Sequence, residues 1–496
     1  MERIRKIGFA YLISLRSHFQ RKIFLLRRQL LRNCLCNKKQ PFAYTIRFII
    51  AAVLISGFFT INIMNLFCTD ELYPVGAEIS FSAASVLTGA AVLAASALII
   101  FLILRVESKY KTLIALIAAF ALRILFVMFW KIEPTSDFKI TLELSKLLHN
   151  TPFFKWGAAL DSYGTIYNNQ WSAHMPFIIF QSFFAGDNYM TIQIVNAFFS
   201  GLTCVFTAGI SNEIYGKKAA EATLMLSAVN PVSLFYIPVL TNQHISVCFF
   251  TAALWVFYKR PFKNNYLNII ICAVLTAISH LIRPEMYIVI IAAAVMCVCD
   301  MNKNKIKKVV ALIVYIAVFF SVLFSVDVFL RSNSITHQSL FNGNLKYKIT
   351  VGMNKETGGA WNEPDAELIY DKEALNSEFS KRIHSPSIKT MYGKIAYQFG
   401  TYVYPWSMSE NHKLVSQLIC RRGSAAFMSA VIVMAVLVLL FSREKRIFPI
   451  CLIVTGYMAA FSLIEIQARY NYLIIPLLLI LSGGALKDGL PKKSSL

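Results

Sequence analysis

Charged residues are scarce in this sequence. Asp, Glu, Lys and Arg make up 15% of the 496 residues, whereas 57% are hydrophobic. Soluble domains usually contain roughly 25% charged residues. Apolar runs of about 20 residues, long enough to cross a bilayer, recur along the chain. These features exclude an ordinary soluble protein and predict an all-α polytopic membrane protein.

Metal-site and disulfide patterns are also missing. The eight histidines do not show HxxxH or HxxE spacing, and most of the ten cysteines lie inside apolar runs or in the basic N-terminal region. Such an arrangement favours neither a histidine metal site nor a disulfide framework. The sequence therefore indicates no certain cofactor and leaves the use of a divalent cation open.

The formal net charge of +23 would suggest nucleic acid as a partner if the protein were soluble. Its placement argues otherwise, because Lys and Arg concentrate in short loops between apolar runs and in residues 1–42. This is the positive-inside pattern of membrane proteins. We expect no nucleic-acid partner, and we expect residues 1–42 to stay cytoplasmic because no signal-peptide apolar region precedes them. The basic residues there either bind anionic membrane lipids or only set the topology.

The parity of basic loops predicts about twelve transmembrane helices with both termini cytoplasmic. Residues 140–148 and 173–186 are too short to cross a core of roughly 30 Å, so we expect them to be helices on the outer surface. The alternative, a true span at 173–186, would invert the sidedness of the following loops. The predicted parts are a cytoplasmic tail (1–42), an N-terminal transmembrane hairpin (43–109), a transmembrane core (110–328) with a first outer loop (131–188), an outer segment between spans nine and ten (329–423), and C-terminal helices with a cytoplasmic tail (424–496).

Asp137 is the first candidate functional residue. It follows an apolar run that ends in Phe129-Trp130, and aromatic residues at the end of such a run mark the membrane–water boundary. The carboxylate is therefore expected just outside the bilayer, where it can reach both a soluble substrate and the head group of a lipid. The alternative is an ordinary acidic loop residue.

Few charges are predicted near the middle of the membrane, and Arg123 and Glu221 are the clearest of them. A set of ionisable residues is predicted to gather at the outer face instead: Asp137, Asp161, His174, His244, Arg283, Glu285, Asp327, Glu465 and Arg469. A transporter is expected to place ionisable groups near the midplane. The pattern therefore favours a reaction at the interface. A polytopic transporter or lipid flippase of the cell envelope, or a non-catalytic membrane assembly protein, remains an alternative.

Arg469, with Tyr470 beside it, and Arg283 are predicted to bind a phosphate at the bilayer surface. Glu465 and Arg469 have i,i+4 spacing, so a structural ion pair at a helix end is the alternative. The loop at 351–365 contains Gly, Asn and Trp, a composition that suits a loop covering a sugar-sized ligand; an ordinary turn-rich loop is the alternative. The candidate substrate contacts are Gln243, His244, Glu465, His174, Asn354 and Trp361.

Several short motifs together resemble the GT-C class of membrane glycosyltransferases. They are Pro134-Thr-Ser-Asp-Phe138, Asn196, Tyr215-Gly-Lys-Lys-Ala-Ala220, Asn230-Pro231, Arg283-Pro284, and Arg469-Tyr470 with Pro476. The particular similarity is to bacterial relatives of the dolichyl-phosphate-mannose protein mannosyltransferases, glycosyltransferase family 39. It extends over most of residues 110–486, whereas the first two spans look like an added hairpin.

This resemblance implies a hexosyl- or pentosyltransferase in a bacterial cell membrane, with its active site facing outside. Asp137 is then the catalytic base, and the donor is a sugar on a polyprenyl phosphate. The acceptor is a glycan, a lipid or a protein, and inversion at the anomeric carbon is expected. One departure is that relatives often carry an acid between spans five and six, where this chain has Thr241-Asn-Gln-His244. That difference puts a metal requirement in doubt.

Overall fold

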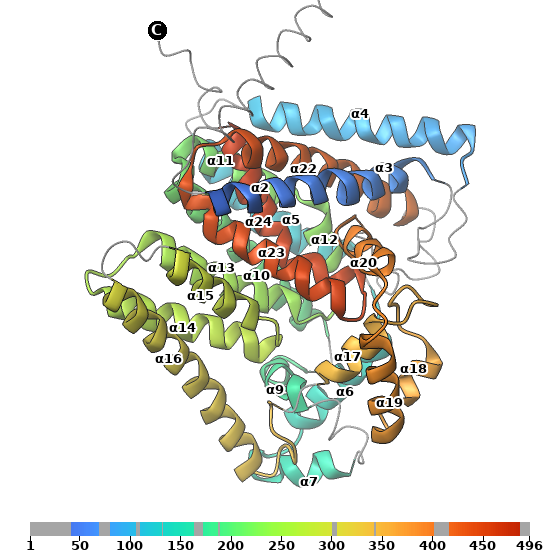
Figure 1. Cartoon of the computed structure of the whole chain (residues 1–496), viewed down its shortest axis with the longest axis vertical. Helices are drawn as coiled ribbons and strands as arrows, with labels where there is room; N and C mark the ends of the chain where they lie inside the picture. Colours follow the sequence, from blue (N-terminus) through green and yellow to red (C-terminus); the bar gives the residue numbers. More distant parts are fainter. Residues whose placement is uncertain are drawn as a thin grey trace, which may run out of the picture.

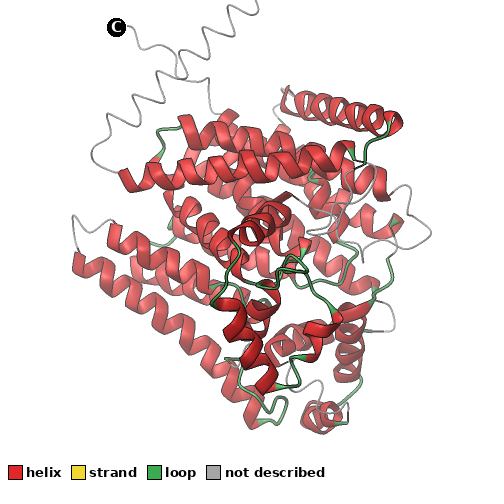
Figure 2. Cartoon of the chain, turned by 45° about the vertical axis from the view of Figure 1, so that its right-hand side comes forward, coloured by secondary structure: helices red, strands yellow, loops and turns green. Residues whose placement is uncertain are grey.

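The computed structural model describes residues 41–68, 80–105, 110–130, 132–162, 172–186, 189–299, 305–341, 344–400 and 416–486. Within these ranges the chain consists of helices, connecting loops and an isolated bridge between Ala360 and Ile466 (Figure 2). The predicted all-α class is confirmed. The basic region up to residue 40, positions 401–415 of the predicted outer segment and the tail from residue 487 lie outside the described residues.

Nine helices in the described ranges are long and apolar enough to cross a membrane, so the chain is a multi-pass membrane protein. They are Phe42–Phe67 (α2, Pro41–Val53; η1, Leu54–Phe59; α3, Thr60–Phe67), α4 (Ala83–Arg105), α5 (Lys111–Phe129), α10 (Met190–Tyr215), α14 (Asn265–Ile282), Ile306–Ser332 in α16 (Lys305–Ser332), Cys420–Phe441 (end of η6, Ser416–Gly423; α22, Ser424–Phe441), Lys445–Leu463 (η7, Lys445–Ile447; α23, Phe448–Leu463) and Arg469–Leu486 (end of η8, Ala468–Leu473; α24, Ile474–Gly483; η9, Gly484–Leu486).

Three predicted spans correspond to shorter helices. The span predicted at 219–239 is broken into α11 (Lys217–Ala228) and α12 (Pro231–Tyr236), while α13 (Gln243–Lys259) has 17 residues and α15 (Tyr287–Cys299) has 13. The break lies at Pro231, which has no N–H to continue a helix. At a rise of about 1.5 Å per residue, α13 covers about 25 Å, less than a full hydrocarbon core. The count of about twelve spans stays a prediction.

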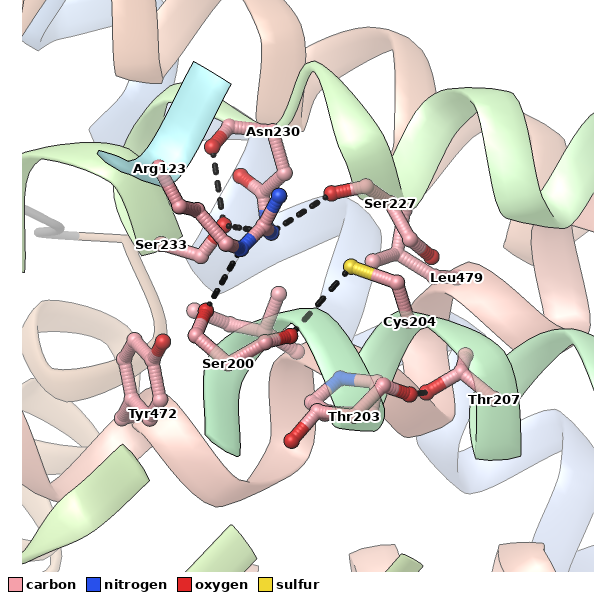
Figure 3. Close-up of a pocket in the computed structure, with 12 residues that line it drawn as sticks. Arg123, Ser200, Thr203, Cys204, Thr207, Ser227, Asn230, Ser233, Tyr472 and Leu479 are labelled. Carbon is pink, nitrogen blue, oxygen red and sulfur yellow. Dashed lines mark hydrogen bonds between the residues drawn. The ribbon is translucent and has the colours of Figure 1, made fainter. Parts of the chain in front are cut away.

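Arg123 of α5 compensates for the break after α11. It is 1% exposed, and it lines a small cavity with residues of α10, α11 and α24 (Figure 3). Its five N–H donors reach the hydroxyls of Ser200 and Ser233 and the carbonyls of Ala119, Ser227 and Ala228, at 2.8 to 3.1 Å. Ser227 and Ala228 are the last residues of α11, whose carbonyls a continuing helix would otherwise satisfy. Arg123 therefore caps a helix inside the protein.

The N-terminal helices pack against the C-terminal ones. In Figure 1, α2, α3 and α4 lie beside α22, although some 350 residues separate them. The buried side chain of Arg47 in α2 donates through Nη1 to the Ser442 carbonyl after α22 at 2.8 Å. A C-terminal residue likewise donates to the N-terminal part, since Arg421 Nη2 bonds to the Cys68 carbonyl after α3 at 2.9 Å. The hairpin predicted as an addition is thus joined to the rest of the chain by buried hydrogen bonds.

Most of the remaining helices lie in the lower part of Figure 1, near the lower end of α16, whereas α20 lies higher, next to α23. One group follows α5 and consists of α6 (Ser136–His149), η2 (Phe153–Lys155), α7 (Trp156–Asp161), η3 (Ser172–His174) and α9 (Met175–Ser182). The other follows α16 and consists of α17 (Leu345–Gly352), α18 (Glu363–Glu367), α19 (Lys372–Ile383) and α20 (Ile388–Gly400). Short helices are therefore present where the sequence predicts surface helices at 140–148 and 173–186.

Candidate active site

Asp137 lies in the first turn of α6 and not in a loop, because α6 begins four residues earlier than its predicted start at 140. The preceding Ser136 has a φ of 50°, in the left-handed region that few non-glycine residues adopt. Such strained residues are concentrated at functional sites. The position at a helix N-terminus also favours a negative charge on Asp137.

The helix that carries Asp137 is held by its buried side. Phe138, Leu142, Leu144 and Leu148 are buried along one face of α6. Where α6 packs against α9, Ser145 donates to the side chain of Gln181 in α9 at 3.0 Å. The buried apolar residues thus hold α6 in place, and the half-exposed Asp137 carboxylate lies in its first turn.

Arg469 is the basic partner of Asp137. Its Nη2 lies 3.5 Å from Asp137 Oδ2, and the side chain of Arg469 is 12% exposed against 48% for Asp137. Arg469 Nε also donates to Gln467 Oε1 at 2.6 Å, and Gln467 Nε2 donates to Glu465 Oε1 at 2.6 Å. Residues 464–467 are not helical, so Glu465 and Arg469 do not form an i,i+4 pair on a helix. Gln467 bridges them instead.

Tyr470 lies among three cationic side chains. The Arg283 and Arg469 guanidinium carbons are 5.0 and 5.9 Å from the centre of its ring. Lys348 Nζ donates to the Tyr470 hydroxyl at 3.1 Å. An aromatic ring attracts cations to its face, which offsets part of the repulsion between them. The structure thus brings Arg283, Arg469 and Tyr470 together, as predicted, and adds Lys348.

The turn before α13 supports two of these cations. Asn242 Oδ1 accepts from Arg283 Nη1 at 3.2 Å, and Gln243 Nε2 donates to the Arg469 carbonyl at 3.2 Å. Arg283 also pairs with Glu285. Gln243, predicted as a substrate contact, is buried and acts on the Arg469 backbone. His244 is fully buried and bonds through Nδ1 to the Tyr472 hydroxyl at 2.9 Å, so the structure places it in the core behind the site.

His174 faces the same cations from η3. Burial, together with the positive charges of Lys348, Arg283 and Arg469, lowers the pKa of His174 to about 3. Its imidazole is therefore neutral at physiological pH. The pKa of Lys348 is raised by its interaction with Tyr470 and, against the effect of burial, by Glu465, so Lys348 is charged. A cationic cluster of this kind suits an anionic ligand.

Asn354 and Trp361 lie in the predicted ligand-covering loop. Asn354 Nδ2 donates to Asp365 Oδ2 at 2.8 Å, and Asp365 pairs with Arg382 at 2.8 Å, so Asn354 belongs to a network inside the loop. The loop reaches the site through its backbone, since Ala360 pairs with Ile466. Trp361 is the next residue and is 56% exposed. Of the two, Trp361 is the one available to a ligand.

The donor set does not fit a divalent metal. No group of three His, Cys, Asp or Glu side chains that could hold a metal ion occurs among the described residues. Asp137 and Glu285 each face an arginine, and the turn between α12 and α13 offers amides where relatives often carry an acid. Carboxylate oxygens are the usual ligands of Mg²⁺ and Ca²⁺.

Lys348, Asn242 and Gln467 were missed by sequence reasoning. Lys348 lies in a short helix of the predicted outer segment, more than 100 residues from Arg469, and no local motif marks it. Its position depends on a backbone contact, because the Glu465 N–H donates to the Lys348 carbonyl at 2.8 Å. The only sequence signal for Lys348 was its position just before the loop that was predicted to cover the ligand.

Three solved structures of the oligosaccharyltransferase of the archaeon Archaeoglobus fulgidus are similar to this chain. One is tethered to an acceptor peptide (12% identity, TM-score 0.35), one is the AglB protein with an inhibitory peptide and a dolichol-phosphate (13%, 0.34), and one contains Zn and sulfate (13%, 0.34). They cover 78%, 78% and 77% of this chain, which spans 56%, 57% and 54% of theirs.

No curated protein matches the sequence. A family model does match, and it covers residues 171–326, from η3 and α9 through most of α16. This segment contributes His174, Gln243 and Arg283 to the site. The resemblance predicted from the motifs is confirmed there: residues 171–326 match the dolichyl-phosphate-mannose-protein mannosyltransferase family.

Proposed function

We propose that this protein is a membrane glycosyltransferase that transfers a hexose or pentose from a polyprenyl phosphate to an acceptor hydroxyl. The acceptor is part of a glycan, a lipid or a protein at the outer face of the membrane. The observation that carries the proposal is the 3.5 Å pairing of the Asp137 carboxylate with Arg469 inside a cluster of three cations. The family match over residues 171–326 supports the same class of enzyme.

Asp137 is the base in this proposal. Its side chain is half exposed and lies at the start of a helix whose other face is buried, so it is both accessible and held in place. The carboxylate accepts the proton of the acceptor hydroxyl while the hydroxyl oxygen attacks the anomeric carbon of the sugar. Attack opposite to the leaving phosphate inverts that carbon.

The cations act on the leaving group. As the bond between the anomeric carbon and the phosphate oxygen breaks, the electron pair stays on the phosphate, and Arg469 and Lys348 stabilise the negative charge. Arg283, whose guanidinium is held by Glu285 and Asn242, adds positive charge next to the Tyr470 ring. Donor binding replaces Asp137 with phosphate as the partner of Arg469. The same exchange leaves Asp137 available to the acceptor.

The hydrogen bonds of Arg123 weaken the alternative that the protein is a transporter. Arg123 is a fully buried charge within a predicted span, the kind of residue that often lines a transport pathway. Here all five of its N–H donors are satisfied by neutral groups of the protein, and two of these groups are the end of α11. Arg123 thus has a structural explanation.

The proposal is tested by transfer from a defined donor. Purified protein in nanodiscs is given polyprenyl phosphate that carries a radiolabelled sugar, together with extracted envelope glycolipids or a hydroxyl-containing peptide. We expect label in the acceptor and an equal amount of free polyprenyl phosphate. Movement of the intact labelled lipid between leaflets, without cleavage of the sugar, would show a flippase instead.

Replacement of Arg469 by Ala is expected to raise the KM for the lipid donor by about tenfold or more and to change the acceptor KM little. Hydrogen bonds to charged groups contribute about 1.5–3 kcal/mol, and this side chain is mostly buried. Arg469→Lys should recover only part of the loss, because an ammonium group lacks the paired donors of a guanidinium.

Lys372→Ala is the control for Arg469→Ala, since Lys372 is exposed on α19. It should behave like the wild type in the same steady-state assay. An Arg469→Ala enzyme with an unchanged donor KM would assign Arg469 a purely structural role beside Asp137 and Gln467.

The predicted sidedness has its own test. With both termini cytoplasmic, residues 131–188 and 329–423 face outside, so single cysteines at Ser162 and Asn362 should react with an impermeant maleimide in intact cells. Labelling at either position only after permeabilisation would contradict the proposed orientation of the site. A cysteine at Lys259, in a predicted cytoplasmic turn, is the control and should need permeabilisation.

A further inference from the structure

Lys394 in α20 is a buried lysine that the proposed reaction does not use. It is 1% exposed, and its Nζ donates to the Gly352 carbonyl at 2.6 Å and to the Ile464 carbonyl at 3.0 Å. Burial lowers the pKa of Lys394 to about 7. Whether charged or neutral, the amine keeps at least two N–H donors for these two carbonyls. A lysine is buried this deeply only where its polar end is satisfied.

The two acceptors belong to the two segments that supply cations to the site. Gly352 ends α17, which carries Lys348 one turn earlier. Ile464 begins the connection that leads to Arg469. The two segments also bond to each other, since the Glu465 N–H donates to the Lys348 carbonyl at 2.8 Å. Lys394 therefore joins the segment of Lys348 to the segment of Arg469 from a third element.

The packing around Lys394 allows little movement. A Cβ on Gly352 would lie 2.2 Å from the Leu463 carbonyl oxygen, so the two backbones are in direct contact. A Cβ on Gly359 would lie 2.4 Å from Lys394 Cδ, and Gly359 has a φ of 82° that favours glycine. The aliphatic part of Lys394 thus fills the space that Gly359 leaves.

The helix that carries Lys394 is itself fixed to the N-terminal hairpin. The Tyr392 hydroxyl donates to Ser56 Oγ at 2.7 Å. A Cβ on Gly57 would lie 3.1 Å from Ala396 Cα, so α20 and η1 are closely packed. In Figure 1, α20 lies between α3 and α23 on one side and α17 on the other. The structure therefore contains a continuous path of contacts from the hairpin through Lys394 to the site.

We propose that Lys394 is a positioning residue for glycosyl transfer, because it holds α17 and the 464–467 connection in the register in which Lys348 and Arg469 face one phosphate. This inference rests on the proposed function. Without the amine, two buried carbonyls lose their donor, and the two segments can separate. Displacements of about 1 Å are enough to impair catalysis, so the effect should fall on turnover while the fold survives.

The test compares Lys394→Met with Lys389→Met. Methionine keeps most of the aliphatic volume and removes the donors, and Lys389 is exposed on the same helix. In full-length protein in nanodiscs, Lys394→Met should lower kcat by about tenfold with a melting temperature close to that of the wild type. Hydrogen exchange should become faster at the Glu465 and Ile466 amides, which are bonded across the two segments. Lys389→Met should change none of these quantities.

Two further measurements separate positioning from general stability. In a Lys348→Met background, adding Lys394→Met should cost much less than in the wild type, because one of the groups it positions is already gone. If Lys394→Met does not fold, Lys394→Gln, which keeps an N–H donor, takes its place and should show a smaller loss of the same kind.

The inference is overturned if kcat of Lys394→Met equals that of Lys389→Met, or if the losses from Lys348→Met and Lys394→Met are additive. Unchanged hydrogen exchange at Glu465 and Ile466 also overturns it. Failure of the proposed function is distinguishable, since the wild type would then transfer no sugar. In that case the hydrogen-exchange comparison still tests whether Lys394 holds α17 and the 464–467 connection together.

Discussion

Asp137→Asn is expected to lower sugar transfer by about 10²-fold or more, the usual contribution of a general base. The amide keeps the size of the side chain and can still accept a hydrogen bond, but it cannot take the proton of the acceptor hydroxyl. The side chain is 48% exposed, so the fold should tolerate the change. Turnover is measured in nanodiscs with lipid-linked donor, and donor binding is measured separately.

Asp137→Glu should recover little of this activity, because one methylene moves the carboxylate away from a position fixed by the first turn of α6. Glu133→Gln is the control, since Glu133 is an exposed acid just before the same helix. It should retain most of the activity. Near-normal transfer by well-folded Asp137→Asn would show that Asp137 is not the base.

Arg123→Met is expected to destabilise the protein by roughly 3 kcal/mol or more. The change removes the arginine donor from the Ala228 and Ser227 carbonyls and from the Ser200 and Ser233 hydroxyls. The Ser227 carbonyl then keeps only the long bond from the Asn230 N–H at 3.4 Å. Each buried polar group left unsatisfied costs about 1–3 kcal/mol. The melting temperature, followed as loss of the monodisperse peak in size-exclusion chromatography, should fall by several degrees. Arg123→Lys should recover part of this stability because an ammonium has three donors where five are used.

Lys217→Met is the matched control for Arg123. Its side chain is 84% exposed at the start of α11, the helix whose other end Arg123 caps. Its melting temperature should equal that of the wild type. If Arg123→Met melts at the same temperature as the control, Arg123 does not stabilise the end of α11, and its buried charge needs a functional explanation.

Much of the scaffold could be predicted because apolar runs and basic loops follow directly from the bilayer. Asp137 and Arg469 were both named from the sequence because each lies next to the end of a span. The helix start at Ser136 was not predicted, since it depends on a left-handed residue for which serine gives no signal. The break at Pro231 was not predicted, since residues 219–239 were expected to form one span, and the arginine that caps the end of α11 comes from another helix.

Lys348 and Lys394 show the second reason for missed residues. Lys394 donates to the carbonyls of two distant residues, and Lys348 is placed by the distant Glu465 N–H, which donates to the Lys348 carbonyl. Lysines in a polar segment ordinarily indicate a solvated surface. Asn354 is a residue whose contacts differ from those that the sequence suggested, and its contact with a ligand stays a prediction. Its Gly- and Asn-rich surroundings predicted a ligand contact, whereas its amide satisfies Asp365 within the loop.

The contact of Gly352 with the 463–464 backbone, and of Gly359 with Lys394, also defines a sequence signature. Any larger residue at 352 would collide with a carbonyl, and any other residue at 359 would be both strained and crowded. Two glycines seven positions apart, followed by a lysine on a later helix, should therefore identify homologous chains that dock the segment in this way. Chains of similar span pattern that lack the trio should join their polar segment to the membrane helices by different contacts.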